Sequence, residues 1–247
     1  MEITLDSPYG LKKADLARPI SLGISLKPGP SNPNCYYAED PVFETILSGD
    51  FIGDVSKGGP VNYQKITFTP HGNGTHTECI GHITPDRETM DKTMDSFHFF
   101  AEIITVQPKK IGADHIVQLA DYLDKRKYDT EALIIRTLPN DDSKRTQKYS
   151  GENPPFLDPK ITNHLSQSGV NHLIIDLPSV DKEIDGGKLE AHKNYWNILR
   201  EKRINATITE LAYIPNEVSD GLYLLNLQIP LMEIDATPSN PIVYILY

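Results

Sequence analysis

Residues 71–82 read HGNGTHTECIGH and hold three of the chain's eight histidines, together with one glutamate. No other stretch concentrates metal-ligand side chains in this way. The glycines and the asparagine between His71 and His76 disfavour a regular helix, so the sequence predicts a turn that leads into a short strand. Alternation along that strand would place His76 and Glu78 on one face. Imidazole and carboxylate groups that converge beside a Gly-rich turn suit zinc, manganese or iron, and we expect a metal site here.

A polar loop is the competing interpretation of these residues, with each histidine bonded only to backbone carbonyls. That interpretation would hold for a single histidine, but three histidines with an interleaved glutamate favour a metal. One loop offers fewer ligands than a metal site needs. A distant histidine and a distant acidic residue should therefore complete the site.

His192 and Glu210 are the best candidates for these distant ligands. His192 follows IIDLPSVD (174–181), an apolar strand that breaks at Pro178 and leads into an acidic loop. Glu210 lies in ATITEL (206–211), where a glutamate on a buried strand costs several kcal/mol unless it is paired or coordinated. Taken alone, each residue favours a structural role slightly over a ligand role.

Composition excludes several classes of function. The net charge is −10 and the few basic pairs are isolated, so nucleic acid is not expected as a partner. Cys35 and Cys79 do not suggest a disulfide framework, and we expect Cys79 to be buried and to face away from the metal side. The start, MEITLDSPYG, lacks the features of a signal peptide, and no apolar run is long enough to span a membrane. These features predict a cytoplasmic protein.

The order of apolar runs and turns predicts a mixed α/β domain over residues 1–247, because strands and helices alternate only in the middle. Several runs carry Ile, Val and Leu without polar alternation, which is typical of strands buried on both faces. The predicted strands are Asp15–Ile20, Lys65–Thr69, Glu102–Gln107, Ala132–Thr137, Asn171–Leu177, Ala206–Leu211, Leu222–Leu227 and Ile242–Leu246. The predicted helices are Ala113–Lys125, Pro159–Gln167 and Tyr195–Arg203.

Common catalytic signatures are absent: the chain has no G-x-S-x-G elbow, no H-E-x-x-H and no Walker A loop. The cluster instead resembles the motif H-x-G-T-H-x-D-x-P-x-H of the cyclase family of metal-dependent hydrolases, whose best-known enzyme is bacterial kynurenine formamidase. Gly74–His76, Glu78 and His82 match that motif in register, with Glu78 in place of Asp and Ile80 in place of Pro.

Two later stretches also resemble the family. Residues 175–181, IDLPSVD, are similar to the family's I-D-x-P-S-x-D followed by a histidine, here His192. Residues 206–210 resemble the β-segment that ends in a ligand glutamate, and residues 222–246 resemble the closing strand pair. The resemblance runs from Asp15 to the end of the chain, with residues 30–60 as a loop-rich insertion.

The resemblance implies a mixed-sheet swivelling β/β/α fold and a homodimer or higher homo-oligomer. It implies that His76 binds one metal ion, that Glu78 bridges two, and that His192 and Glu210 hold the second. His82 would be the catalytic proton donor and acceptor. The implied cofactor is one or two divalent metal ions, with zinc first and manganese as the alternative.

Three departures from the family pattern stand out. The family's first ligand histidine falls on Gly72, whereas His71 lies one position earlier. Either the turn is re-formed so that His71 reaches the metal, or the first metal position is weakened or empty. Glu78 is one methylene longer than Asp. The family's early Trp-Pro-Gly-Asp appears as residues 27–30, KPGP, which removes an aromatic surface from the substrate side.

The expected activity is hydrolysis of a small-molecule amide by metal-activated water, of the arylformamidase type, acting on N-formylkynurenine or a related formyl-aromatic amide. Tryptophan catabolism is the pathway that the family suggests. Hydrolysis of a cyclic amide such as isatin is the alternative reaction. A non-catalytic small-molecule-binding member of the fold is the alternative from another class, and the Gly72 departure is the feature that favours it.

Overall fold

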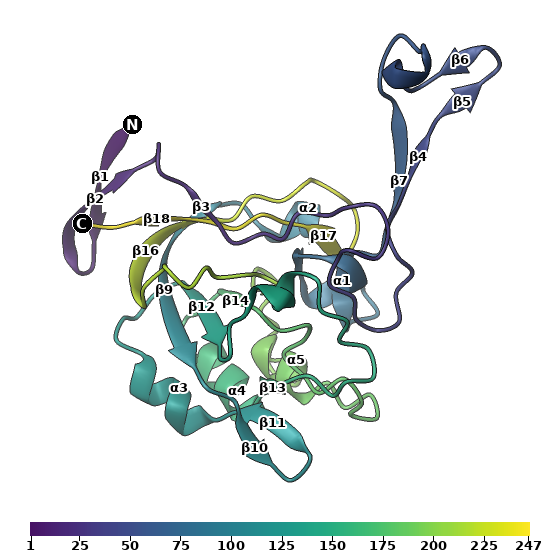
Figure 1. Cartoon of the computed structure of the whole chain (residues 1–247). Helices are drawn as coiled ribbons and strands as arrows, with labels where there is room; N and C mark the ends of the chain where they lie inside the picture. The colour runs from purple at the N-terminus through teal and green to yellow at the C-terminus, as the bar shows by residue number, and fades with distance from the viewer.

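The long apolar runs form the centre of a nine-stranded mixed sheet, whose strand order is β17-β8-β15-β14-β12-β9-β16-β18-β3 (Figure 1). The computed structural model describes all residues from 1 to 247. The strands of this sheet are β3 (Ile20–Ser21), β8 (His76–Glu78), β9 (His98–Val106), β12 (Ala132–Thr137), β14 (His172–Ile175), β15 (Thr207–Glu210), β16 (Gly221–Asn226), β17 (Ala236–Pro238) and β18 (Ile242–Ile245).

Shorter elements surround this sheet. The remaining strands are β1 (Glu2–Ser7), β2 (Gly10–Asp15), β4 (Val42–Thr45), β5 (Leu47–Ser48), β6 (Phe51–Ile52), β7 (Gln64–Thr67), β10 (Lys109–Ile111), β11 (Asp114–Val117) and β13 (Phe156–Leu157). The α-helices are α1 (Pro70–Asn73), α2 (Met90–Thr93), α3 (Leu119–Lys125), α4 (Pro159–Gln167) and α5 (Glu190–Tyr195). Three 3-10 helices span Val55–Lys57, Ile80–His82 and Asp142–Arg145. None of the helices has the length and apolar character that a membrane crossing requires.

The centre of the sheet is parallel and its two sides are antiparallel. Strands β9, β12, β14 and β15 run parallel, whereas β8 pairs antiparallel with β15 and β16 pairs antiparallel with β9. The predicted mixed α/β class is thus confirmed.

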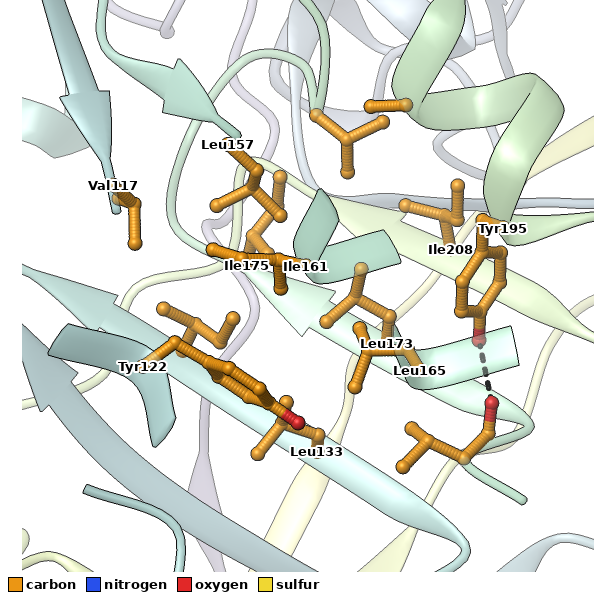
Figure 2. Close-up of a cluster of buried hydrophobic side chains, with 14 of the residues drawn as sticks. Val117, Tyr122, Leu133, Leu157, Ile161, Leu165, Leu173, Ile175, Tyr195 and Ile208 are labelled. Atoms are coloured by element: carbon orange, nitrogen blue, oxygen red, sulfur yellow. Dashed lines mark hydrogen bonds between the residues drawn. The ribbon is translucent and has the colours of Figure 1, made fainter. Parts of the chain in front are cut away.

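Both faces of the central strands are buried, as the unbroken apolar runs predict. Along β12, Leu133 and Ile135 face the core under helices α3, α4 and α5, while Ala132 and Ile134 face the opposite core. Figure 2 shows the helix side, where Tyr122, Leu165 and Tyr195 from the three helices pack onto the sheet. Burying each large aliphatic side chain contributes roughly 1.5–3 kcal/mol to the stability of the fold. The central strands therefore hold the position of the sheet strand β8, which carries part of the site.

Three predicted elements were wrong in part. The strand expected over 15–20 is interrupted: Asp15 ends β2, residues 16–18 form a turn in which the Asp15 carboxylate accepts the Ala17 N–H, and Ile20 begins β3. Residues 113–125 divide into strand β11 and helix α3, since Asp114–Val117 pairs with both β10 and β13. The helix expected over 195–203 does not form: helix α5 spans Glu190–Tyr195, and beyond it Asn197 adopts a left-handed conformation with φ of 53°.

Residues 42–67 form a hairpin arm that projects away from the main sheet (Figure 1). Strands β4 and β7 make its stem, and β5 and β6 make its tip. Six of its apolar side chains are about half exposed or more, whereas Phe43, Ile46, Phe51 and Ile52 are partly buried; the six are Val42, Leu47, Val55, Val61, Tyr63 and Ile66. The arm overlaps the expected insertion at 30–60 but continues to Thr67, where the chain returns to the body just before α1.

Candidate metal centre

Strand β8 carries the centre of the site, and its pairing explains how. His76 and Glu78 alternate onto one face as predicted, and both side chains are fully buried. The antiparallel register with β15 places Glu210 directly opposite His76, with 3.6 Å between His76 Nε2 and Glu210 Oε2. The Val180 N–H donates to Glu210 Oε1 at 3.0 Å and holds that carboxylate in place. His76 and Glu210, which lie 134 positions apart in the chain, thus meet through one strand pairing.

His71 reaches this centre although it lies one position before the expected histidine. Its Nδ1 lies 3.2 Å from Glu78 Oε2. A side chain at position 72 has no room, because a Cβ there would lie 2.3 Å from the Ala38 Cβ. The segment that crowds Gly72 is tied to α1, since the Cys35 N–H donates to the Gly72 carbonyl at 3.1 Å. The turn is therefore re-formed so that residue 71, and not residue 72, faces Glu78.

His192 comes from helix α5 on the other side of Glu78. Its Nε2 lies 3.1 Å from Glu78 Oε1, and its Nδ1 lies 2.6 Å from Asp181 Oδ2. The same Asp181 carboxylate accepts the backbone N–H groups of Ala191 and His192, which begin the helix. Asp181 thus fixes both the helix start and the His192 ring. A carboxylate behind a ligand imidazole is the usual outer partner in metal sites.

His82 lies at the open side of the centre, at the end of the 3-10 helix Ile80–His82, with about 30% of its side chain exposed. Its Nε2 is 3.8 Å from Glu78 Oε2, and its Nδ1 is 3.2 Å from Asp235 Oδ2. His82 also lies beside the other histidines, with ring centroids 4.2 Å from His71 and 5.6 Å from His192.

Protons balance the carboxylates of the site when no cation is bound. Burial opposes the charged form of His192, but its bonds to Asp181 and Glu78 outweigh burial and raise its pKa to about 10. Burial likewise opposes the charged form of His71, yet Asp235 and Glu78 raise its pKa to about 10. Burial would raise the pKa of Glu78, but the neighbouring histidines hold it well below its usual range. A metal ion must displace these protons to bind.

One observation in particular indicates that these residues fit a divalent metal ion. His76 Nε2 and Glu78 Oε2 are buried and form no well-aligned hydrogen bond, although His71 Nδ1 lies 3.2 Å from Glu78 Oε2. His76 Nδ1 lies 3.0 Å from the Gly74 carbonyl, so it carries the ring proton in the neutral form and leaves Nε2 as an acceptor. Buried acceptors without a hydrogen bond are costly unless a cation lies beside them. Donor atoms of His71, His76 and Glu78 lie within 4.8 Å of one another, as do those of Glu78, His82 and His192.

A cavity of about 300 Å³ opens onto these residues. His71, His82, His192 and Glu210 contribute to its inner wall. Tyr36 also lines the cavity and adopts a left-handed backbone conformation with φ of 56°. Burial, and then the charge of Glu210, raise the pKa of the Tyr36 hydroxyl, so it stays protonated at neutral pH.

All six residues singled out from the sequence meet at this centre; they are His71, His76, Glu78, His82, His192 and Glu210. Their individual roles stay predictions. Cys79 is buried and donates to the Glu88 carbonyl, away from the donors above. Two carboxylates were missed. Asp181 ends the stretch IDLPSVD, eleven residues before His192, so the sequence could have suggested it as a partner of that histidine. No pattern in the sequence indicates Asp235.

Comparisons with known proteins identify a family that the chain matches. The profile of the Cyclase family, described as "Putative cyclase", matches residues 14–182, which is more than half of the chain. The kynurenine formamidase of Bacillus cytotoxicus is 27% identical over 232 residues, covering 93% of this chain and 95% of the relative.

Solved structures share the fold at low sequence identity. A potential metal-dependent hydrolase with cyclase activity has a TM-score of 0.67 at 12% identity, covering 92% of this chain and 97% of its own. Isatin hydrolase A from Labrenzia aggregata, bound to benzyl benzoate, has a TM-score of 0.65 at 12% identity, covering 92% and 93%. The family match extends over the cluster at 71–82 and the segment at 175–181, and the chain belongs to the Cyclase family.

Proposed function

We propose that this protein is a metal-dependent hydrolase that cleaves the C–N bond of a small-molecule amide, with a formyl-aromatic amide such as N-formylkynurenine as its substrate. The observation that carries the proposal is the pair of orphaned buried acceptors, His76 Nε2 and Glu78 Oε2, beside an open cavity. The similarity to kynurenine formamidases supports the substrate class. A place in tryptophan breakdown and a cytoplasmic location remain predictions.

Zinc is the proposed metal, with manganese as the alternative, because imidazole nitrogens and carboxylate oxygens suit both. His71, His76, Glu78, His192 and Glu210 would hold it, as one ion or as two that share Glu78. The two Glu78 oxygens face different histidines, His71 and His192, which supports a shared carboxylate. When bound, the metal would activate water and polarise the substrate carbonyl.

Side chains of the cavity would carry out proton transfer and substrate binding. His82 is close to the centre and partly exposed, so it can hand a proton to the leaving nitrogen. The Tyr36 ring offers the aromatic surface that the KPGP segment lacks, and its protonated hydroxyl can donate to the substrate. A volume of about 300 Å³ is at the lower end for small-molecule sites, which favours one or two rings rather than a peptide.

The competing functions differ in what they require of the site. Hydrolysis of a cyclic amide of the isatin type needs the same metal and the same attack on a carbonyl, and isatin hydrolase A shares the fold. Gly72 favours a non-catalytic binding protein, but His71 Nδ1 lies 3.2 Å from Glu78 Oε2, and this contact supports a complete metal site.

Metal analysis combined with a substrate screen tests the proposal. We expect the purified chain to contain one or two equivalents of zinc or manganese, and to hydrolyse formyl-aromatic amides in a reaction that chelation stops and metal restores. Turnover of isatin alone would replace the substrate class with cyclic amides. A metal-loaded protein that hydrolyses neither class would contradict the proposed activity.

We further propose that the protein is a homodimer whose contact includes the hairpin arm, residues 42–67. An isolated two-stranded hairpin is marginally stable in water, and this arm exposes apolar side chains such as Leu47 and Ile66 at its tip and stem. Every copy carries the same arm, so a second copy is the partner always present to cover it.

Light scattering during gel filtration measures this directly. The wild-type mass should be twice 27.7 kDa, and the double variant Leu47→Lys/Ile66→Lys should elute near the monomer mass, because two buried charges in the contact are costly. Leu199→Lys is the matched control, since Leu199 is 93% exposed and lies far from the arm in sequence. A monomeric wild type, or a double variant that remains dimeric, would refute the arm contact.

A further inference from the structure

Asp235 lies between two histidines of the site and bonds to both. Its Oδ2 is 2.9 Å from His71 Nε2 and 3.2 Å from His82 Nδ1. Its backbone is held beside strand β8, because the Cys79 N–H donates to the Asp235 carbonyl at 2.9 Å and β17 begins at the next residue. The carboxylate is therefore presented by sheet pairing and not by a free loop.

The two contacts use different nitrogens of the two rings. A carboxylate accepts hydrogen bonds, so each nitrogen that faces Asp235 carries a proton. In the neutral ring, the other nitrogen then has a free lone pair. For His71 that nitrogen is Nδ1, which lies 3.2 Å from Glu78 Oε2, and for His82 it is Nε2, which lies 3.8 Å from the same oxygen.

The Asp235 carboxylate thus selects opposite tautomers in the two neighbouring rings. The nitrogens that keep a lone pair, His71 Nδ1 and His82 Nε2, both lie near Glu78 Oε2. Without Asp235, nothing else bonds His71 Nε2 or His82 Nδ1. Each ring could then flip or change tautomer and offer an N–H where a metal or a substrate needs an acceptor.

We propose that Asp235 is a positioning residue that fixes His71 as the Nε2–H tautomer and His82 as the Nδ1–H tautomer. It prepares His71 to bind metal through Nδ1 and leaves His82 Nε2 free to exchange a proton with substrate. The functional consequence rests on the proposed hydrolase, but the tautomers themselves do not depend on which substrate is cleaved. Asp235 also compensates for the displaced first histidine, because it orients the ring that replaces residue 72.

A second interpretation assigns Asp235 to the metal directly, since donors of His71, His82 and Asp235 also lie within 4.8 Å of one another. The two interpretations predict different metal contents. A positioning residue changes affinity but not stoichiometry, whereas loss of a ligand from a separate ion would remove one equivalent.

Nitrogen-15 NMR of zinc-loaded protein with labelled histidine reads each tautomer. Wild type should show Nε2–H for His71 and Nδ1–H for His82, and Asp235→Ala should lose the Nδ1–H signature of His82. Asp235→Asn keeps an acceptor oxygen and should preserve both tautomers. Zinc affinity, measured by chelator competition, should fall about 10- to 100-fold in Asp235→Ala at unchanged zinc content, as expected for an outer partner of a ligand histidine.

Glu233→Ala is the matched control, because it removes one exposed acidic side chain two positions away and should change neither readout. Unchanged tautomers in Asp235→Ala would overturn the proposal, and so would loss of one zinc equivalent. If the tautomers and affinity behave as expected but no amide is hydrolysed, the proposed function fails while the role of Asp235 stands.

Discussion

Glu78→Gln is expected to abolish metal binding and to reduce amide hydrolysis to the background rate. Glu78 belongs to two of the three groups of side chains that could hold a metal ion. Each of its oxygens faces a different histidine. Loss of an outer partner costs about 10- to 100-fold in metal affinity, so the loss of this shared ligand should cost more than 100-fold. A glutamine also places an NH₂ donor against nitrogens that must act as acceptors.

Equilibrium dialysis followed by elemental analysis measures the effect, alongside hydrolysis of the best formyl-aromatic amide. Glu102→Gln is a matched control, because Glu102 is also a buried glutamate on a strand but bonds to the Lys127 and Tyr128 N–H groups far from the site. That variant should lose stability but keep its metal. Wild-type metal content in Glu78→Gln, or the same result in His76→Ala, would remove the basis of the proposed chemistry.

The part of the site that could be predicted from sequence is the part that depends on local alternation and on chemical type. Alternation along a three-residue strand sufficed to place His76 and Glu78 together. Glu210 was identifiable because a carboxylate on a buried strand needs a partner. The pairing of β8 with β15, which makes His76 that partner, depends on strand order, and strand order is a property of the whole sheet.

The position of His71 could not be decided from sequence because it depends on packing. The Ala38 Cβ leaves no space for a side chain at position 72, and this contact joins segments more than thirty residues apart. Asp235 was missed for a related reason. In the sequence, Asp235 looks like any residue that precedes a strand. Only the pairing of β17 with β8 brings its carboxylate beside the histidines of the site.

The helix predicted over 159–167 is present with those bounds, whereas the helix predicted over 113–125 is wrong in its first part, where a local pattern competes with long-range pairing. Residues 113–117 fit a helical stripe with those that follow, but Ile116 and Val117 pair with Phe156 and Leu157 of strand β13. Branched side chains favour a strand once a partner is available. In the arm at 42–67, by contrast, no long-range pairing competes with the local one. Its strands pair only with each other, and its exposed apolar residues do not pack into the main core.

His82→Gln is expected to keep its metal and to lose turnover by about 10²- to 10⁴-fold, the usual contribution of a positioned proton donor. The side chain is partly exposed and bonds to Asp235 rather than to the buried acceptors, so its removal leaves His76, Glu78 and His192 in place. The loss should appear in kcat, while KM changes little, because the proton is needed only as the C–N bond breaks.

Leaving-group dependence distinguishes this role from that of a ligand. Amides of weakly basic anilines need little protonation at nitrogen, so the defect of His82→Gln should shrink steadily as the aniline becomes less basic. His115→Gln, an exposed histidine on β11, should behave as wild type with every substrate. If His82→Gln instead loses metal, or is equally slow with all leaving groups, then the group Glu78, His82 and His192 is a ligand set and the proton must come from another residue. Tyr36 would be the next candidate, because its hydroxyl remains protonated and lines the same cavity.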